Sequence, residues 1–160
     1  LINKSLGFLI NFQLQGIFIF IVSLCWYFIS LNTSNHLYLL DLFGLGLFTA
    51  ALILETKADL QLYHFRKEFP GQVCNTKLWS LSRHPNCFFE WLIWCSFSIF
   101  ALPSPNGWLA LISPVFLFLM MFYITIPITE GESIKSRGEK YIKYQEKTPK
   151  FFPKIVNPQE

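Results

Sequence analysis

The sequence predicts an all-α integral membrane protein, with about four transmembrane helices arranged as two hairpins, an amphipathic cytosolic segment and a short C-terminal cytosolic helix. Of the 160 residues, 52% are hydrophobic and only 14% are charged, whereas roughly 25% are charged in soluble domains. The thirteen Lys and Arg residues are confined to Lys4, 57–83 and 135–154. The two stretches between them, about fifty residues each, are each long enough for two membrane-crossing helices and a turn.

Four apolar stretches are candidate spans: about Leu6–Leu31, Leu37–Glu55, Pro85–Leu102 and Trp108–Ile128. Two short polar turns, 32–36 and 103–107, join the helices within each hairpin. In the second span the small residues Gly44, Gly46 and Ala50 predict close approach of a neighbouring helix. The four spans therefore follow from hydropathy and turn residues alone.

Two further segments are predicted to be helical but amphipathic. Apolar and charged side chains are mixed over Thr56–Phe69, and Pro70 with Gly71 is expected to end that helix. A second helix is expected from about Glu130 to Lys147, with most of its charges on one side. Both segments belong outside the apolar spans.

The positions of the basic residues predict the orientation of the chain. Lys and Arg are enriched in cytoplasmic loops, so the 57–83 loop and both termini are predicted to be cytosolic in a multi-pass protein. We interpret the lysine run of the tail as a solvated surface facing lipid. Membrane lipid is thus the expected environment of the tail.

Some classes of protein are excluded. The long runs without Lys or Arg do not fit a nucleic-acid-binding face. The four cysteines, Cys25, Cys74, Cys87 and Cys95, form no C-x-x-C pair and have no His at zinc spacing, so we expect neither a disulfide framework nor a metal site. Because the chain begins at Leu1 rather than Met, we expect a trimmed or incomplete product.

The densest polar cluster lies where the cytosolic loop meets the third span, over residues 78–91. Pro85 fits the first position of a helix, where its missing N–H costs nothing. The free backbone N–H groups of that helix start, beside the guanidinium of Arg83, predict a site for an anionic group such as phosphate. Asn86 and Glu90 are four residues apart and share one helical face.

Glu90 is the most informative single residue of this cluster. A carboxylate inside a membrane span is costly unless it is paired or lines a polar cavity. The functional interpretation is that Glu90 binds a ligand, and the alternative is an ion pair with Arg83 or a tail lysine. For His84, the alternative to ligand binding is a capping or interfacial imidazole.

These residues resemble a known family. The run Leu78-Trp79-x-x-Ser82-Arg83-His84-Pro85-Asn86-x-Phe88-x-Glu90 is similar to the signature of the membrane family related to the C-terminal domain of steroid 5-alpha-reductases, usually L-W-x-x-S-R-H-P-N-Y-F-G-E. The resemblance covers roughly residues 54–153. It includes Asp59, Gln61 and Arg66 upstream, and Ile126-Pro127 with Glu130, Tyr141, Tyr144 and Gln145 downstream. Sterol reductases and isoprenylcysteine-type methyltransferases share a looser version of the motif.

The resemblance implies a helical membrane enzyme whose C-terminal domain, residues 54–153, binds NADPH from the cytosolic side. An N-terminal hairpin, 1–53, precedes this domain, and a short tail, 154–160, follows it. The implied cofactor-binding residues are Asp59, Gln61, Arg66, Trp79, Arg83, His84, Asn86, Glu90, Tyr141 and Tyr144. No catalytic residue is implied.

The sequence departs from the family signature at three positions. Cys87 stands in place of the usual tyrosine, Phe89 in place of glycine, and Lys77 where glycine is usual. Three functions therefore stay open: an NADPH-dependent reductase of a lipid-like enone or alkene, a methyltransferase using S-adenosylmethionine, and a degenerate, non-enzymatic membrane scaffold. Neither the substrate nor the oligomeric state is specified by these motifs.

Overall fold

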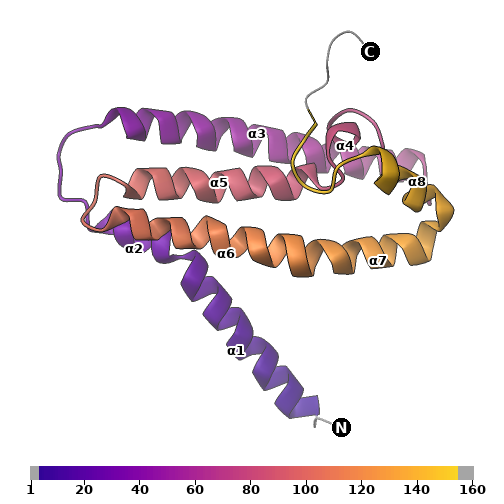
Figure 1. Ribbon diagram of the computed structural model, residues 1–160, viewed down its shortest axis with the longest axis horizontal. Coiled ribbons are helices and arrows are strands. Elements are labelled where there is room, and N and C mark those ends of the chain that lie inside the picture. The colour runs from indigo at the N-terminus through magenta and orange to yellow at the C-terminus, as the bar shows by residue number, and fades with distance from the viewer. Residues whose placement is uncertain (1–3, 155–160) are drawn as a thin grey trace. The chain divides into compact units, whose positions relative to one another are not determined.

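A computed structural model of the chain describes residues 4–154, and every regular element in that range is a helix (Figure 1). The elements are α1 (Lys4–Val22), α2 (Leu24–Ser30), α3 (Leu39–Glu68), α4 (Leu78–Leu81), α5 (Pro85–Ala101), the 3₁₀ helix η1 (Gly107–Leu111), α6 (Ile112–Met120), the π-helical turn η2 (Met121–Thr125), α7 (Ile126–Arg137) and α8 (Glu139–Lys147). The predicted all-α class is confirmed.

Among the described residues, three helical stretches are long and apolar enough to cross a membrane: Gly7–Ser30, Leu39–Glu68 and Gly107–Arg137. They correspond to the first, second and fourth predicted spans. The third predicted span is α5, which has 17 residues and so lies at the short end of the range for a membrane helix.

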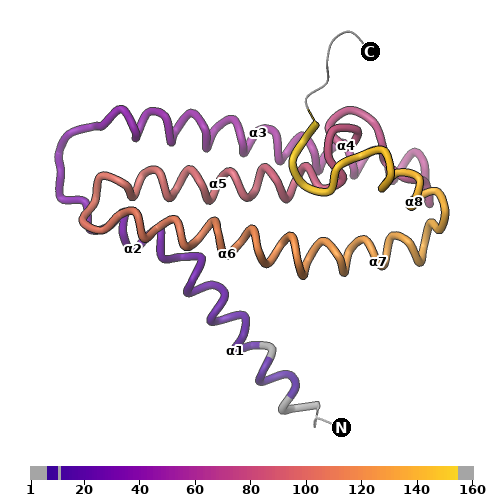
Figure 2. Tube along the Cα trace, viewed as in Figure 1, coloured from indigo at the N-terminus to yellow at the C-terminus, as the bar shows by residue number. Residues whose placement is uncertain are grey.

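The second span and the amphipathic segment after it form one continuous helix, α3, of 30 residues (Figure 2). No Pro or Gly interrupts the chain between Gly46 and Pro70, and strong helix formers fill this interval. The helix ends at Glu68, directly before Phe69-Pro70-Gly71, as predicted. The amphipathic pattern therefore marks a change in the surroundings of α3 rather than a separate helix.

The prediction of a single helix from Glu130 to Lys147 was wrong. Gly138, with φ of 56°, separates α7 from α8. Only a residue without Cβ adopts this backbone conformation at little cost, so Gly138 ends α7 and redirects the chain. Helix α7 itself is the end of the last apolar stretch, Gly107–Arg137.

The described chain divides into two compact units. Unit 1 comprises residues up to Leu45 together with Trp94–Leu117, and unit 2 comprises Gly46–Ile93 together with the residues from Phe118 onward. Unit 1 has a small apolar core of Cys25, Phe28, Ala101 and Ala110. Every residue of the predicted cofactor set falls in unit 2.

Close helix packing in unit 1 involves one of the two predicted glycines. A Cβ on Gly44 would lie 3.2 Å from the Phe100 ring, whereas a Cβ on Gly46 would meet nothing within 4 Å. Gly107 is tighter still, because a Cβ there would lie 1.8 Å from the carbonyl oxygen of Ala101. Polar bonds also link the helices, since the Ser113 hydroxyl donates to the Ile21 carbonyl at 3.2 Å and accepts from the Cys25 N–H at 3.3 Å.

Candidate functional site

The site is organised around the loop between α4 and α5. Helix α4 ends at Leu81, Ser82 has an extended backbone, and α5 begins at Pro85 as predicted. Ser82 is fully buried; its hydroxyl donates to the Phe151 carbonyl at 2.8 Å and accepts from the His84 N–H at 3.1 Å. This side chain therefore links the loop to the C-terminal segment.

Arg83 forms a two-pronged salt bridge with Glu130 of α7. Its Nε lies 2.7 Å from Oε1 of Glu130, and its Nη2 lies 3.3 Å from Oε2. The side chains are only 11% and 9% exposed. The remaining Nη1 donates to the carbonyl oxygens of Gln145 and Thr148, both at 2.8 Å. Most of the donor capacity of Arg83 is therefore used within the protein.

Glu130 also accepts hydrogen bonds from two other side chains. Nε2 of His84 lies 3.1 Å from Oε1, and the Gln145 amide donates to Oε2 at 2.8 Å. Donors thus surround both oxygens of a buried carboxylate, which offsets the loss of its hydration. Glu130 connects the loop before α5 with α7 and α8.

The C-terminal segment 148–154 lies against the same loop. The Arg83 N–H donates to the Pro149 carbonyl, and the Lys154 N–H donates to the Leu81 carbonyl, both at 2.9 Å. Phe151 is 1% exposed and packs edge-on against Phe88 and Trp91. Backbone bonds and aromatic packing therefore both hold this segment in place.

The short helix α4 is tied to its neighbours by three predicted site residues. The Trp79 indole N–H donates to the Ala58 carbonyl at 2.9 Å, and Gln61 accepts from the Leu78 N–H at 3.2 Å. The hydroxyl of Tyr144 donates to the Trp79 carbonyl. Burial raises the pKa of Tyr144, which keeps this phenol a donor. The polar groups of these three side chains thus serve the fold.

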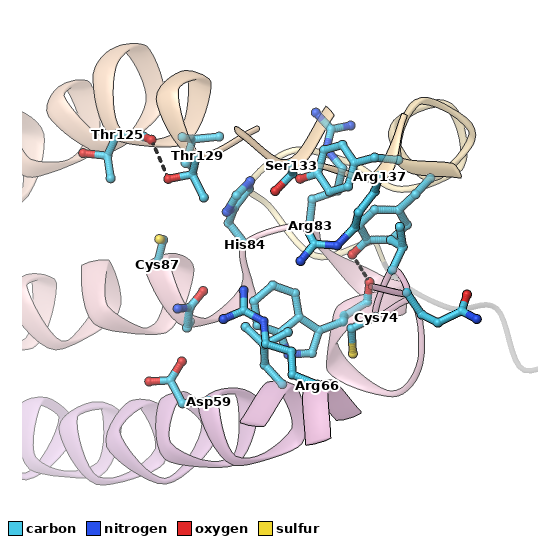
Figure 3. Close-up of a pocket in the computed structure, with 18 residues that line it drawn as sticks. Asp59, Arg66, Cys74, Arg83, His84, Cys87, Thr125, Thr129, Ser133 and Arg137 are labelled. Atoms are coloured by element: carbon cyan, nitrogen blue, oxygen red, sulfur yellow. Dashed lines mark hydrogen bonds between the residues drawn. The ribbon is translucent and has the colours of Figure 1, made fainter. Parts of the chain in front are cut away.

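Unit 2 contains a cavity of about 370 Å³ (Figure 3). Eight of the ten predicted cofactor-binding residues line it: Asp59, Arg66, Trp79, Arg83, His84, Asn86, Tyr141 and Tyr144. They come from α3, α4, the loop before α5, the start of α5 and α8. Gln61 and Glu90 are not among the lining residues. This volume falls in the range of small-molecule sites.

Helix α7 and the preceding π turn supply a wall of the cavity that was not predicted from the sequence. Thr125, Thr129, Ser133 and Arg137 all line it and recur every four residues, which places them on one helical face. On α3, Asp59, Leu62 and Arg66 are three and four residues apart and so also share one face. Polar side chains repeat every four residues at the end of an apolar span, and this pattern could have predicted a polar face here.

The cavity has an excess of positive charge. Arg66, Arg83 and Arg137 line it, and Asp59 is the only carboxylate among the described lining residues. Since Arg83 is paired with Glu130, Arg66 and Arg137 remain as cations without a carboxylate partner in the described part of the chain. Two buried atoms, Nε of Arg137 and Oδ1 of Asn86, also have no hydrogen-bond partner there.

Glu90 does not line the cavity with these cations. It is half-buried and within electrostatic range of two other carboxylates, Asp59 and Glu55. Arg83, one of the partners considered for it, pairs instead with Glu130. The alternative that Glu90 forms an ion pair with Arg83 was therefore wrong.

Residues 2–148 match the model of a family described as "Protein of unknown function (DUF1295)". The chain belongs to this family. No curated protein and no solved structure matches the chain. The matched residues of the DUF1295 family include parts of both units.

Glu130 and Gln145 are the central residues of this DUF1295 site that the predicted set omitted. Glu130, like Glu90, is a carboxylate within a candidate membrane helix and therefore needs a partner or a polar cavity. From the sequence alone, either Glu90 or Glu130 could pair with Arg83. The fold brings Glu130 to Arg83.

Proposed function

We propose that this protein is a membrane-bound, NADPH-dependent reductase acting on a lipid-like enone or alkene. The observation that carries the proposal is the convergence of eight residues, implied as cofactor-binding by sequence resemblance, on one cavity of unit 2. Segments far apart in the chain supply these residues, so their meeting is not a consequence of sequence proximity.

The charges of the cavity support a phosphate-bearing cofactor. NADPH carries a pyrophosphate and a 2′-phosphate, and Arg66 and Arg137 are cations available to such groups. S-adenosylmethionine carries one carboxylate and a positive sulfonium, which an excess of arginine suits less well. The unpartnered atoms of Arg137 and Asn86 are groups that a polar ligand would satisfy.

Each part of the site would then have a distinct role. Arg66 and Arg137 would hold phosphate groups, and the Asn86 amide would hydrogen-bond the ribose or nicotinamide. The salt bridge between Arg83 and Glu130 would keep the start of α5 in position. NADPH, when bound, supplies hydride for reduction of an activated double bond. The proposal assigns no proton donor among the described residues.

The proposed membrane arrangement has four crossings, with α5 as the third and both termini cytosolic. At 1.5 Å per residue a helix the length of α5 reaches about 26 Å, slightly less than the ~30 Å hydrocarbon core. The basic ends of α3 and α7, with Arg66 and Lys67 and with Lys135 and Arg137, would lie on the cytosolic side. NADPH would then reach the cavity from the cytosol.

Calorimetry on detergent-solubilised protein tests the proposal with NADPH and S-adenosylmethionine as separate ligands. We expect NADPH to bind, and binding to weaken as salt rises because the exposed part of the attraction is screened. Arg66→Gln and Arg137→Gln should each weaken it about tenfold or more, the usual effect of losing a hydrogen bond to a charged group. Lys57→Gln, an exposed change on α3 outside the cavity, is the matched control.

The other outcomes favour the alternative functions. Binding of S-adenosylmethionine without NADPH would replace the reductase by a methyltransferase. Binding of neither ligand by folded protein would favour the non-enzymatic scaffold. Equal losses in the arginine variants and in Lys57→Gln would mean that NADPH binds outside this cavity.

A further inference from the structure

A second cleft in unit 2 is lined by lysines rather than by arginines. Lys140, Lys143 and Lys147 of α8 line it together with Lys154 of the tail, and its volume is about 270 Å³. We call it the lysine cleft. Its remaining described lining residues are polar or apolar and include no Asp or Glu.

The four lysines are brought together by helix spacing and by the backbone bond of Lys154. Positions 140, 143 and 147 are three and four residues apart, so they follow one face of α8. The backbone N–H of Lys154 donates to the Leu81 carbonyl at 2.9 Å, which holds the fourth lysine beside them. None of the four forms a salt bridge with a described carboxylate. Four like charges in one cleft repel one another unless an anion lies between them.

The lysine cleft lies just beyond the ends of two candidate membrane spans. One span ends at Glu68 and the other at Arg137, and α8 begins two residues after the second. Segments at such positions lie at the level of the lipid headgroups. An anion found there in high concentration is the phosphate of an anionic phospholipid.

An aromatic groove adjoins the lysine cleft and shares Lys140 and Lys143 with it. Phe65 and Phe69 line this groove with ring centroids 5.2 Å apart, and Phe69 is 44% exposed. Cationic and apolar linings next to each other suit an amphiphile, with its phosphate on the lysines and its glycerol and first acyl carbons on the rings. A soluble phosphate would use the lysines alone.

We infer that the lysine cleft is a binding site for the headgroup of an anionic phospholipid. Val73 and Tyr144 line both the lysine cleft and the cavity proposed to bind NADPH, but none of the four lysines lines that cavity. The cations that would bind the phospholipid are thus different from those that would bind NADPH. Lipid binding here therefore does not depend on the proposed reductase activity.

Native mass spectrometry of the full chain in neutral detergent tests this inference, with phosphatidylglycerol and phosphatidylcholine as probes and glycerol phosphate as the headgroup without acyl chains. We expect phosphatidylglycerol to bind more tightly than either of the others. In Lys140→Gln/Lys143→Gln its affinity should fall about thirtyfold, since each basic side chain near an anionic lipid contributes roughly fivefold. Lys57→Gln/Lys77→Gln removes two exposed lysines outside both the lysine cleft and the groove and should retain the affinity.

Each other result overturns the inference. Equal affinity for the two phospholipids would remove the role of the lysines. Equal losses of phosphatidylglycerol affinity in both double variants would mean that the lipid is attracted by the overall charge and has no specific site. Glycerol phosphate binding as tightly as phosphatidylglycerol would assign the cleft to a soluble phosphate. Thermal unfolding without added lipid verifies that all variants are folded, which is expected because the exchanged lysines are exposed.

Discussion

Arg83 and Glu130, 47 residues apart in the chain, form a buried two-pronged salt bridge at 2.7 and 3.3 Å. The bridge joins the loop before α5 to α7, and His84 and Gln145 add bonds to the same carboxylate. Arg83 and His84, both in the 78–91 polar cluster, are therefore held by a residue of α7, outside that cluster.

The first prediction concerns Glu130→Gln. The change leaves the Arg83 guanidinium buried beside a neutral amide, and breaking a buried pair in this way costs about 3–5 kcal/mol of stability. Glu132→Gln is the matched control, because its bridge to Lys135 is exposed, at 69% and 75%, and such pairs contribute about 0–1 kcal/mol. Chemical unfolding in detergent should separate the two variants, and equal losses would show that the buried bridge does not stabilise the protein.

The second prediction concerns Glu90→Gln. Glu90 lies near Asp59 and Glu55, so neutralising it removes repulsion and strands no Arg83 cation. The free energy of unfolding should stay the same or rise by about 1 kcal/mol. The same unfolding measurement applies, and a loss of several kcal/mol would point to a cationic partner.

The third prediction concerns the bonds that hold the C-terminal segment. Ser82→Ala removes a buried hydroxyl and leaves the Phe151 carbonyl and the His84 N–H without their partner, which costs about 1–3 kcal/mol. Ser80→Ala, whose hydroxyl bonds only locally to the Lys77 carbonyl, should cost less than about 1 kcal/mol. Limited proteolysis should cleave the 148–154 segment faster in Ser82→Ala, and an unchanged cleavage rate would mean that Ser82 does not help to anchor this segment.

The sequence was a reliable guide where the determining chemistry is local. Pro85 starts α5 and Pro70 with Gly71 follows the end of α3, because a proline restricts its own backbone and that of its neighbour. The break at Gly138 was missed, since a glycine adopts positive φ only where the fold needs a change of direction. The residues on either side of Gly138 are compatible with a continuous helix.

Most of the predicted cofactor-binding residues line the candidate site, but the contacts between them were not predicted from the sequence. Asp59 and Arg66 reach the cavity because they share a face of α3, whereas Gln61 lies off that face and bonds the Leu78 N–H. Asn86 and Glu90 share a helical face by spacing, yet only Asn86 lines the cavity. Which end of a shared face meets a cavity depends on the neighbouring helices, and no local pattern contains that information.

The fourth prediction concerns pH. Burial, and then the negative charge of Glu130, raises the pKa of Tyr141 to about 12, against about 10 for an ordinary tyrosine. Folding therefore favours the protonated phenol. The stability that this contributes is fully present below about pH 10 and is lost as the pH rises toward 12.

Alkaline titration followed by ultraviolet difference absorbance tests this shift. The folded protein should show a late component that Tyr141→Phe diminishes, and protein unfolded in a denaturing detergent should lose it, because all its phenols then titrate near the ordinary value. A Tyr141→Phe titration curve that matches the wild type would contradict the assignment to Tyr141.

The last prediction concerns the third membrane crossing, which depends on α5. If α5 crosses the membrane, the 103–107 turn lies on the side opposite the basic 57–83 loop. Ser104 is a poor labelling position because it is only 6% exposed, whereas Pro105 and Asn75 are exposed. A cysteine at Pro105 should react with a membrane-impermeant thiol reagent only from the far side, and a cysteine at Asn75 only from the cytosolic side, each above the background of the four native thiols. Reaction of both from the cytosolic side would show that α5 re-enters without crossing, since a helix of this length reaches only about 26 Å and needs a thin or locally thinned bilayer to span it.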